Sequence, residues 1–212
     1  EAGGNGTPER HRATHLPMKK REEPPEEGPL RADAARNRER VLAVAREQLA
    51  GGDSSLQMNQ LARAAGVGVG TVYRHFPTRQ DLLEALVREH LQSLLDEARE
   101  AEAADNVRQG IQRFLHALLD LMLADVGLAE VLNAPEDASP LTSQLKVELG
   151  AATRRVLTRA HRSGVVRPEV GADDLRRLMC GVAHAVNIGG DSRGSAERYL
   201  TILLDGLRPT PR

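Results

Sequence analysis

The segment LARAAGVGVGTVYRHFPTR, residues 61–79, decides the fold that the sequence predicts. It indicates two short helices, over 59–65 and 69–75, with a break between them. Gly66 can end the first helix in a left-handed conformation, and Gly68 can occupy the cap position of the second. Two short helices joined by such a tight turn are typical of a helix-turn-helix.

The second of these helices has two chemically different sides. Val72 and Phe76 lie four residues apart on one side and are expected to pack inward. The rest of its surface carries side chains with hydrogen-bond donors, namely Thr71, Tyr73, Arg74 and His75. A short helix of this kind is suited to lie in the major groove of DNA.

The helix that follows is predicted to be long. Pro77 ends the preceding helix, and Thr78 with Asp81 three residues later matches a capping box with Asp in place of Glu. An apolar stripe then runs through residues 79–103. At about 1.5 Å per residue this helix spans roughly 37 Å, enough to join the helix-turn-helix to a separate body.

Composition predicts a folded, all-α protein. Of the 212 residues 40% are hydrophobic, which suffices for a globular core, yet only 2% are aromatic and none is tryptophan. Leucine and alanine dominate, and alternating runs of β-branched residues are rare, so strands lack their usual material.

Cysteine usage and hydropathy bear on the compartment. The single cysteine, Cys180, excludes an intrachain disulfide and a multi-cysteine metal site, and its apolar neighbours favour a small buried side chain. No apolar run reaches the roughly 18 residues of a membrane span, and the N-terminus lacks the apolar core of a signal peptide. The sequence therefore predicts a cytoplasmic protein without a membrane partner.

The net charge of −1 hides an asymmetry along the chain. Residues 31–77 hold seven arginines against four acidic residues, which gives +3. Residues 78–212 hold seventeen basic against twenty acidic residues, which gives −3. Positive charge is thus concentrated around the predicted helix-turn-helix, where DNA would be attracted.

Three stretches resemble the tetracycline-repressor (TetR) family of transcription regulators: Arg38-Glu-Arg-Val-Leu42, Leu61-Ala-Arg-Ala-Ala-Gly-Val67 and Gly70-Thr-Val-Tyr-Arg-His-Phe-Pro77. The resemblance implies an all-α homodimer of about nine helices per chain, with an N-terminal three-helix DNA-binding domain and a C-terminal helical bundle. It also implies a repressor that a small-molecule effector releases from an inverted-repeat operator on double-stranded DNA.

The predicted domains are an arm at 1–30, a DNA-binding domain at 31–77 and a ligand-binding and dimerisation domain at 78–212. The arm is rich in Gly, Pro, Glu and Arg, which favours disorder, and its Met18 fits either a natural start or an internal methionine. The first helix is predicted to begin at Asn37, a good N-cap, and to end before Gly51.

Apolar spacing and cap residues predict the helices of the C-terminal domain. The expected ranges are 79–103, 107–124, 127–133, 140–163, 172–188 and 195–207. Ser139 and Pro140 open the fourth of these, and Ser195 is expected to cap the last one.

Position by position, the resemblance assigns DNA contacts to the helix-turn-helix. It assigns contacts with phosphates or base edges to Thr71, Tyr73, His75 and Arg79, and it assigns a variable contact position to Arg74. Val69 departs from the family pattern, which has a longer polar side chain there, and Gly68 replaces the usual capping serine.

Five further positions complete the predicted DNA contacts. Val69 can touch a thymine methyl group, and Gly70 allows the backbone close to the duplex. Asn59 is either a contact or a solvated residue. Arg36 and Arg38 sit where the chain enters the first helix and are placed to touch phosphates.

The resemblance further implies an effector pocket in the C-terminal domain. Its candidate lining is Phe114, Leu118, Met122 and Met179, with His116, His184 and Asn187 as polar anchors. A solid core without a pocket is the equal alternative.

The last two predicted helices are apolar on more than one side. Such helices must bury one side in their own domain and the other elsewhere, which favours a two-fold dimer over a helix central to one chain. The candidate interface residues are Leu175, Met179, Val182, Val186, Tyr199, Ile202, Leu203 and Leu207.

No catalytic residue, cofactor or metal site is predicted. The glycines at 66–70 lack the spacing of phosphate-binding loops, the histidines are scattered over separate helices, and no nucleophile motif is present. The sequence therefore predicts a DNA-binding regulator that is not an enzyme. A dimeric helical interaction protein without DNA binding is the alternative.

Overall fold

The computed structural model describes residues 29–189 and 192–209. These ranges hold nine helices and no strand, so the all-α prediction is confirmed. The helices are α1 (Pro29–Ala50), α2 (Met58–Ala64), α3 (Val69–His75), α4 (Arg79–Ala103), α5 (Val107–Ala124), α6 (Val126–Asn133), α7 (Pro140–Arg162), α8 (Ala172–Ile188) and α9 (Ser192–Gly206). The predicted arm and Met18 lie outside the described residues, except that residues 29–30 belong to α1.

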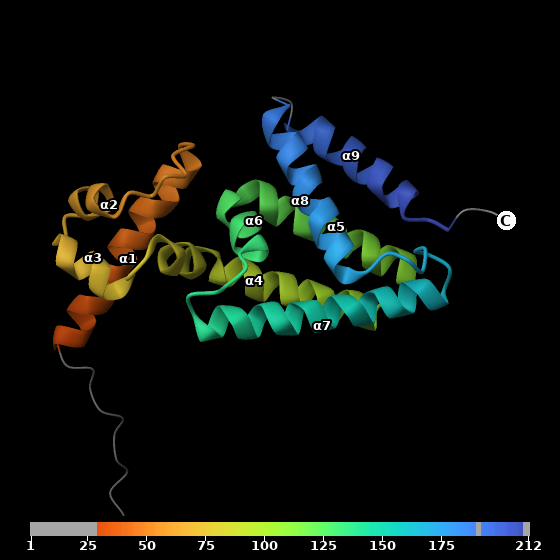
Figure 1. The fold of residues 1–212 in the computed structure, drawn as a ribbon, viewed down its shortest axis with the longest axis horizontal. Helices are drawn as coiled ribbons and strands as arrows, with labels where there is room; N and C mark the ends of the chain where they lie inside the picture. Colours follow the sequence, from red (N-terminus) through yellow and green to blue (C-terminus); the bar gives the residue numbers. More distant parts are fainter. Residues whose placement is uncertain (1–28, 190–191, 210–212) are drawn as a thin grey trace, which may run out of the picture.

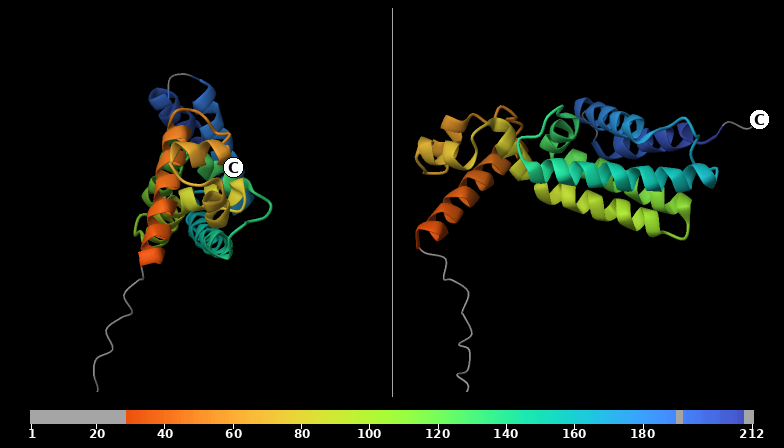
Figure 2. Two further views of the ribbon diagram at one scale, coloured as in Figure 1. Left: turned by 90° about the vertical axis from the view of Figure 1, so that its left-hand side faces the viewer. Right: turned by 60° about the horizontal axis from the view of Figure 1, so that its bottom comes forward.

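The molecule is elongated, with a small head of α1–α3 at one end and a body of α5–α9 at the other (Figure 1). The right-hand view of Figure 2 shows the two groups side by side along the long axis. Helix α4 belongs to both, because it packs against α1 in the head and against α5, α6 and α7 in the body. The apolar stripe predicted for 79–103 is buried along its whole length, from Leu82 to Ala101.

Local signals place most helix ends correctly. The capping box at the start of α4 is present, since Thr78 Oγ1 accepts from the backbone N–H of Asp81 (3.1 Å) and Asp81 Oδ2 accepts from that of Thr78 (2.9 Å). Helices α5, α6, α7 and α8 begin within one residue of their predicted starts.

Two predicted caps are wrong. Helix α1 begins at Pro29 rather than at Asn37, whose side chain instead accepts a hydrogen bond from Arg40 inside the helix. The residues before Asn37 include three alanines, so helix propensity carries the helix past a good cap residue. Ser195 likewise lies inside α9, where its Oγ accepts from Arg198 (3.3 Å) rather than from free backbone N–H groups.

A buried carboxylate fixes the loop between α6 and α7. Glu84 of α4 is fully buried and accepts hydrogen bonds from the backbone N–H groups of Ala138 (2.7 Å) and Ser139 (2.8 Å). The Gln80 amide donates a third at 2.9 Å. Because Ala138 and Ser139 precede the first turn of α7, the negative charge also lies at the positive end of that helix. Glu84 therefore anchors the start of α7 to α4.

None of the helices in the two described ranges is both long and apolar enough to cross a membrane.

Candidate nucleic-acid interface and internal cavity

The turn between α2 and α3 has the geometry that its glycines predict. Gly66 adopts φ +64°, and the N–H of Val67 reaches back to the carbonyl of Ala62 (3.0 Å), which closes the end of α2. Gly68 occupies the N-cap position of α3 in an extended conformation. The predicted helix-turn-helix is therefore present.

Helix α3 is anchored by two buried side chains and exposes most of the others. Val72 is completely buried and Phe76 is 1% exposed. On the outer side Tyr73 is 46% exposed and Val69 is 41% exposed. Of the other predicted contact residues in this helix, Gly70 and Arg74 are exposed, while Thr71 and His75 are half-buried. The outer side of α3, which we call the recognition surface, thus combines an aromatic hydroxyl, a guanidinium and an apolar side chain.

Arg79, which was also predicted to contact phosphate, binds a body residue. Its guanidinium donates to both carboxylate oxygens of Glu130 in α6 (Nη2–Oε2 3.0 Å) and to the carbonyl of Ser54 (2.8 Å). The hydrogen bond to Glu130 raises the pKa of Arg79 above its ordinary value. In the same loop as Ser54, hydrogen bonds from Ser55 lower the pKa of Asp53. Arg79 thus ties the first turn of α4 to both the head and α6.

The arginines of α1 are likewise engaged locally. Arg36 is exposed and pairs with Asp33 one turn earlier. Arg38 is half-buried, pairs with Glu39 at 3.2 Å, and places its guanidinium 5.4 Å from the ring centroid of Phe76. Arg38 therefore packs against the base of α3 and is less free than the sequence suggests. Asn59 is exposed near the start of α2.

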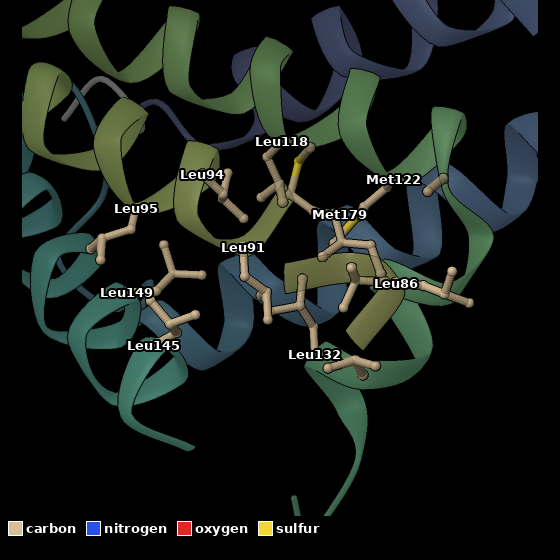
Figure 3. Close-up of a cluster of buried hydrophobic side chains, with 14 of the residues drawn as sticks. Leu86, Leu91, Leu94, Leu95, Leu118, Met122, Leu132, Leu145, Leu149 and Met179 are labelled. Carbon is tan, nitrogen blue, oxygen red and sulfur yellow. The ribbon is translucent and has the colours of Figure 1, made fainter. Parts of the chain in front are cut away.

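A cavity of about 560 Å³ opens in the body between α4, α5, α7 and α8. Its apolar wall includes Leu94, Phe114, Leu118, Met122, Leu149 and Leu175. Figure 3 shows four of these, Leu94, Leu118, Met122 and Leu149, within one buried cluster. Three predicted lining residues, Phe114, Leu118 and Met122, therefore border this cavity.

The predicted polar anchors His116, His184 and Asn187 do not border this cavity. His184 and Asn187 lie on the exposed side of α8, and Met179 is completely buried without bordering the cavity. His116 is hydrogen-bonded to the carbonyl of Gln112 (Nδ1–O 2.8 Å) and borders a separate open groove. None of the four therefore borders this cavity. For His184 and Asn187 the reason is that the inward side of α8 runs through Leu175, Met179, Ala183 and Val186, which turns residues 184 and 187 outward.

The polar residues that border the cavity were not predicted from the sequence. They come from the end of α6 and its following loop, from α7 and from the start of α8, and they are Asn133, Asp137, Ser143, Lys146, Thr153, Arg154, Asp173 and Arg176. A weak signal was available, because Lys146 and Thr153 fall on the side of α7 that carries its buried leucines.

The predicted dimer interface needs a similar correction. Leu175, Met179, Val186 and Leu207 are at most 3% exposed, because they form part of the core of their own chain, so they offer no surface to a partner. Ile202 is 62% exposed, and Val182, Tyr199 and Leu203 are half-buried. Two further large apolar side chains of α8 are exposed, Leu178 at 44% and Ile188 at 73%.

The lone cysteine and the histidines form no metal site in the part of the chain that the structure describes. Cys180 is half-buried rather than buried, and its sulfur accepts a hydrogen bond from Asn133 Nδ2 (3.0 Å).

Comparison with known proteins identifies relatives of both parts of the chain. The model for bacterial regulatory proteins of the tetR family matches residues 41–86, and the model for the C-terminal domain of SbtR-like transcriptional regulators matches residues 106–209. An HTH-type transcriptional regulator of Staphylococcus aureus is 33% identical over 67 residues, which are 31% of this chain and 36% of that protein. The chain thus spans about a third of the length of the curated relatives that it matches.

Solved structures match over nearly their whole length. A TetR transcriptional regulator from Streptomyces coelicolor is 30% identical, covering 82% of this chain and 99% of that one, with a TM-score of 0.52. The regulator RolR, solved with its ligand resorcinol, is 18% identical over 84% of this chain and 91% of its own, with a TM-score of 0.55, and it shows the fold alone. Family models for both domains and a relative matched end to end agree, and the chain therefore belongs to the TetR family of bacterial transcriptional regulators.

Proposed function

We propose that this protein is a homodimeric, DNA-binding transcriptional repressor that a small molecule releases from an inverted-repeat operator. The observation that carries the proposal is the recognition surface of α3, which is held in place by Val72 and Phe76 and exposes Tyr73 and Arg74. Membership of the TetR family supports the same function.

The recognition surface has the chemistry for both classes of DNA contact. The hydroxyl groups of Thr71 and Tyr73 and the imidazole of His75 can donate to phosphate oxygens. Arg74 can donate two hydrogen bonds to a guanine, and Val69 can contact a thymine methyl group. In this assignment Arg74 and Val69 read sequence, whereas the other three hold the backbone.

Two copies are required for an operator with two half-sites. We assign the dimer contact to the exposed sides of α8 and α9, where Leu178, Ile188 and Ile202 place large apolar side chains in solvent. Figure 1 shows these two helices side by side on one edge of the body. A two-fold axis there would set two α3 helices on one side of the DNA, with half-sites about 34–36 Å apart or a modestly larger distance if the duplex bends.

The body supplies the effector site in this proposal. The 560 Å³ cavity is of the size that small-molecule pockets have, and RolR shows that this fold can hold a small ligand. Helix α6 joins the cavity to the head, because Leu132 and Asn133 border the cavity while Glu130 binds Arg79. A ligand that prefers one position of α6 would therefore shift the population of head positions.

The decisive experiment is selection of genomic fragments by the purified protein, followed by fluorescence anisotropy on the selected site at several salt concentrations. We expect an inverted repeat and an affinity that falls steeply with salt. Arg74→Ala should weaken binding to the selected site more than to random DNA, while Arg162→Ala, at the far end of α7, serves as the matched loss of charge. Binding that depends neither on salt nor on inverted symmetry would instead favour the interaction protein without DNA binding.

A further inference from the structure

Some polar side chains at the cavity have all their hydrogen-bonding groups in use, and others do not. This difference indicates which chemical group of a ligand the cavity can bind. Lys146 donates to the carbonyls of Val131 (3.0 Å) and Ala134 (3.2 Å) and to Asp137 Oδ1 (2.7 Å). The other oxygen of Asp137 accepts from the hydroxyl of Ser143 at 3.0 Å. All three ammonium protons and both carboxylate oxygens are therefore in use, and this pair offers a ligand little charge.

Two arginines at the cavity still have free donors. Arg176 gives one nitrogen, Nη1, to the side chain of Asn133, and its Nε lies 3.8 Å from Asp173, a contact longer than a hydrogen bond. Within the described ranges no hydrogen bond engages its Nη2. Arg154 is exposed at the mouth of the cavity, and no protein acceptor in those ranges engages its guanidinium. The Nη1 of Arg154 lies beside Gly150, 3.5 Å from the position that a Cβ would take there.

The free charge at the cavity is positive. Once Lys146 and Asp137 are counted as a neutral pair, Arg154 and Arg176 face only Asp173, whose side chain is 78% exposed. Two guanidinium groups with unused N–H donors match the fork geometry of a carboxylate. The part of the wall that α4 and α5 contribute, Leu94, Phe114, Leu118 and Met122, offers only apolar contact.

We propose that the effector cavity takes an amphipathic monocarboxylate, whose apolar body packs against the α4 and α5 wall and whose carboxylate is held by Arg154 and Arg176. This inference rests on the proposed function, because it names the class of ligand for that effector site. An amine would be repelled by the two guanidinium groups, and a neutral alcohol would give their unused donors no anionic partner.

The test compares ligands that share one apolar body. Decanoate, 1-decanol and decylammonium are titrated into the full protein by calorimetry, below the concentrations at which they form micelles. We expect decanoate to bind at least about tenfold more tightly than 1-decanol, and we expect decylammonium to bind more weakly than 1-decanol. Hexanoate, tetradecanoate and an aromatic acid extend the series to shorter, longer and flat apolar bodies.

Variants locate the site. Arg154→Gln and Arg176→Gln should each reduce the preference for decanoate over decanol, whereas Arg154→Lys should retain part of it. Arg162→Gln removes a charge from the same helix outside the cavity and should leave the preference unchanged, and circular dichroism checks that each variant is folded.

The outcomes separate the ligand class from the regulator assignment. Equal binding of decanoate and decanol, unchanged preference in both arginine variants, or no binding by any carboxylate of the series would overturn the inference. Operator binding is measured in parallel by anisotropy, and operator binding that survives such a result leaves the proposed regulator intact.

Discussion

Replacing Glu130 by Gln should increase the affinity of the protein for its operator. Glu130 holds the guanidinium of Arg79 through two hydrogen bonds, and Arg79 is the residue that the family resemblance assigns to phosphate. If Arg79 has to turn from Glu130 to the DNA, the loss of that ion pair opposes DNA binding. Glu130→Gln removes the carboxylate charge while keeping a side chain of the same shape.

The magnitude follows from the exposure of the pair. The side chains are 36% and 47% exposed, so solvent screens the charges and the pair contributes about 0.5–1 kcal/mol, with the bidentate geometry favouring the upper value. Removing about 1 kcal/mol of competition raises the affinity roughly fivefold for one subunit and up to about 30-fold for both. The slope of affinity against salt should stay unchanged, because the number of neutralised phosphates is unchanged.

Anisotropy on the selected operator measures the effect, and a double-mutant cycle assigns it. In an Arg79→Gln background, Glu130→Gln should have no effect, and Arg79→Gln alone should reduce the salt slope by about one to two units in the dimer. Glu148→Gln is the matched control, because Glu148 pairs with Arg99 in the body at similar exposure. An operator affinity that is unchanged or lower in Glu130→Gln would refute the idea that Arg79 exchanges partners.

Three further predictions address the turn, the buried carboxylate and the dimer. Gly66→Ala should lower the free energy of unfolding in urea by about 1 kcal/mol, because φ is +64° and no atom within 4 Å of the new Cβ adds a clash. Glu84→Ala should lower it by about 3 kcal/mol, because the two charge-assisted hydrogen bonds from the backbone before α7 are lost, and Glu84→Gln should recover part of that loss. Ile202→Glu should keep the helical circular dichroism of one chain but give monomers in sedimentation velocity, and a variant that remains a dimer would exclude α9 from the interface.

The parts of the fold that were predicted correctly depend on contacts between residues close in sequence. The left-handed conformation of Gly66 and the reciprocal bonds of Thr78 and Asp81 each involve a few neighbouring residues, so the chemistry of those residues determines the geometry. The same locality explains the failure at Asn37. A cap residue marks only a possible start, and the alanines before it allow the helix to begin earlier at lower free energy.

The errors in the candidate sites come from contacts that are distant in sequence. Helix α8 is apolar on two sides, and packing against α5 and α9 decides that Met179 faces inward and His184 faces solvent. The ion pair of Arg79 could not be predicted from the sequence either, because its partner Glu130 is 51 residues away. Glu84 was detectable, since it lies on the same side of α4 as Val87 and Leu91, where a charge has to find a buried partner.

Helix α6 is the place where the two proposed ligands, the operator and the carboxylate, would act on each other. Glu130 binds Arg79, and three residues later Asn133 accepts from Arg176 at the cavity. A phosphate competes for Arg79 and a carboxylate competes for Arg176, so each ligand releases one contact of the same short helix. If α6, once freed from Arg176, settles more closely against Arg79, occupation of the cavity strengthens the Arg79–Glu130 pair and therefore opposes DNA binding, and coupling of this kind is reciprocal. Because each contact is partly exposed, the coupling amounts to about 1 kcal/mol per subunit, which gives a graded loss of operator affinity rather than complete release.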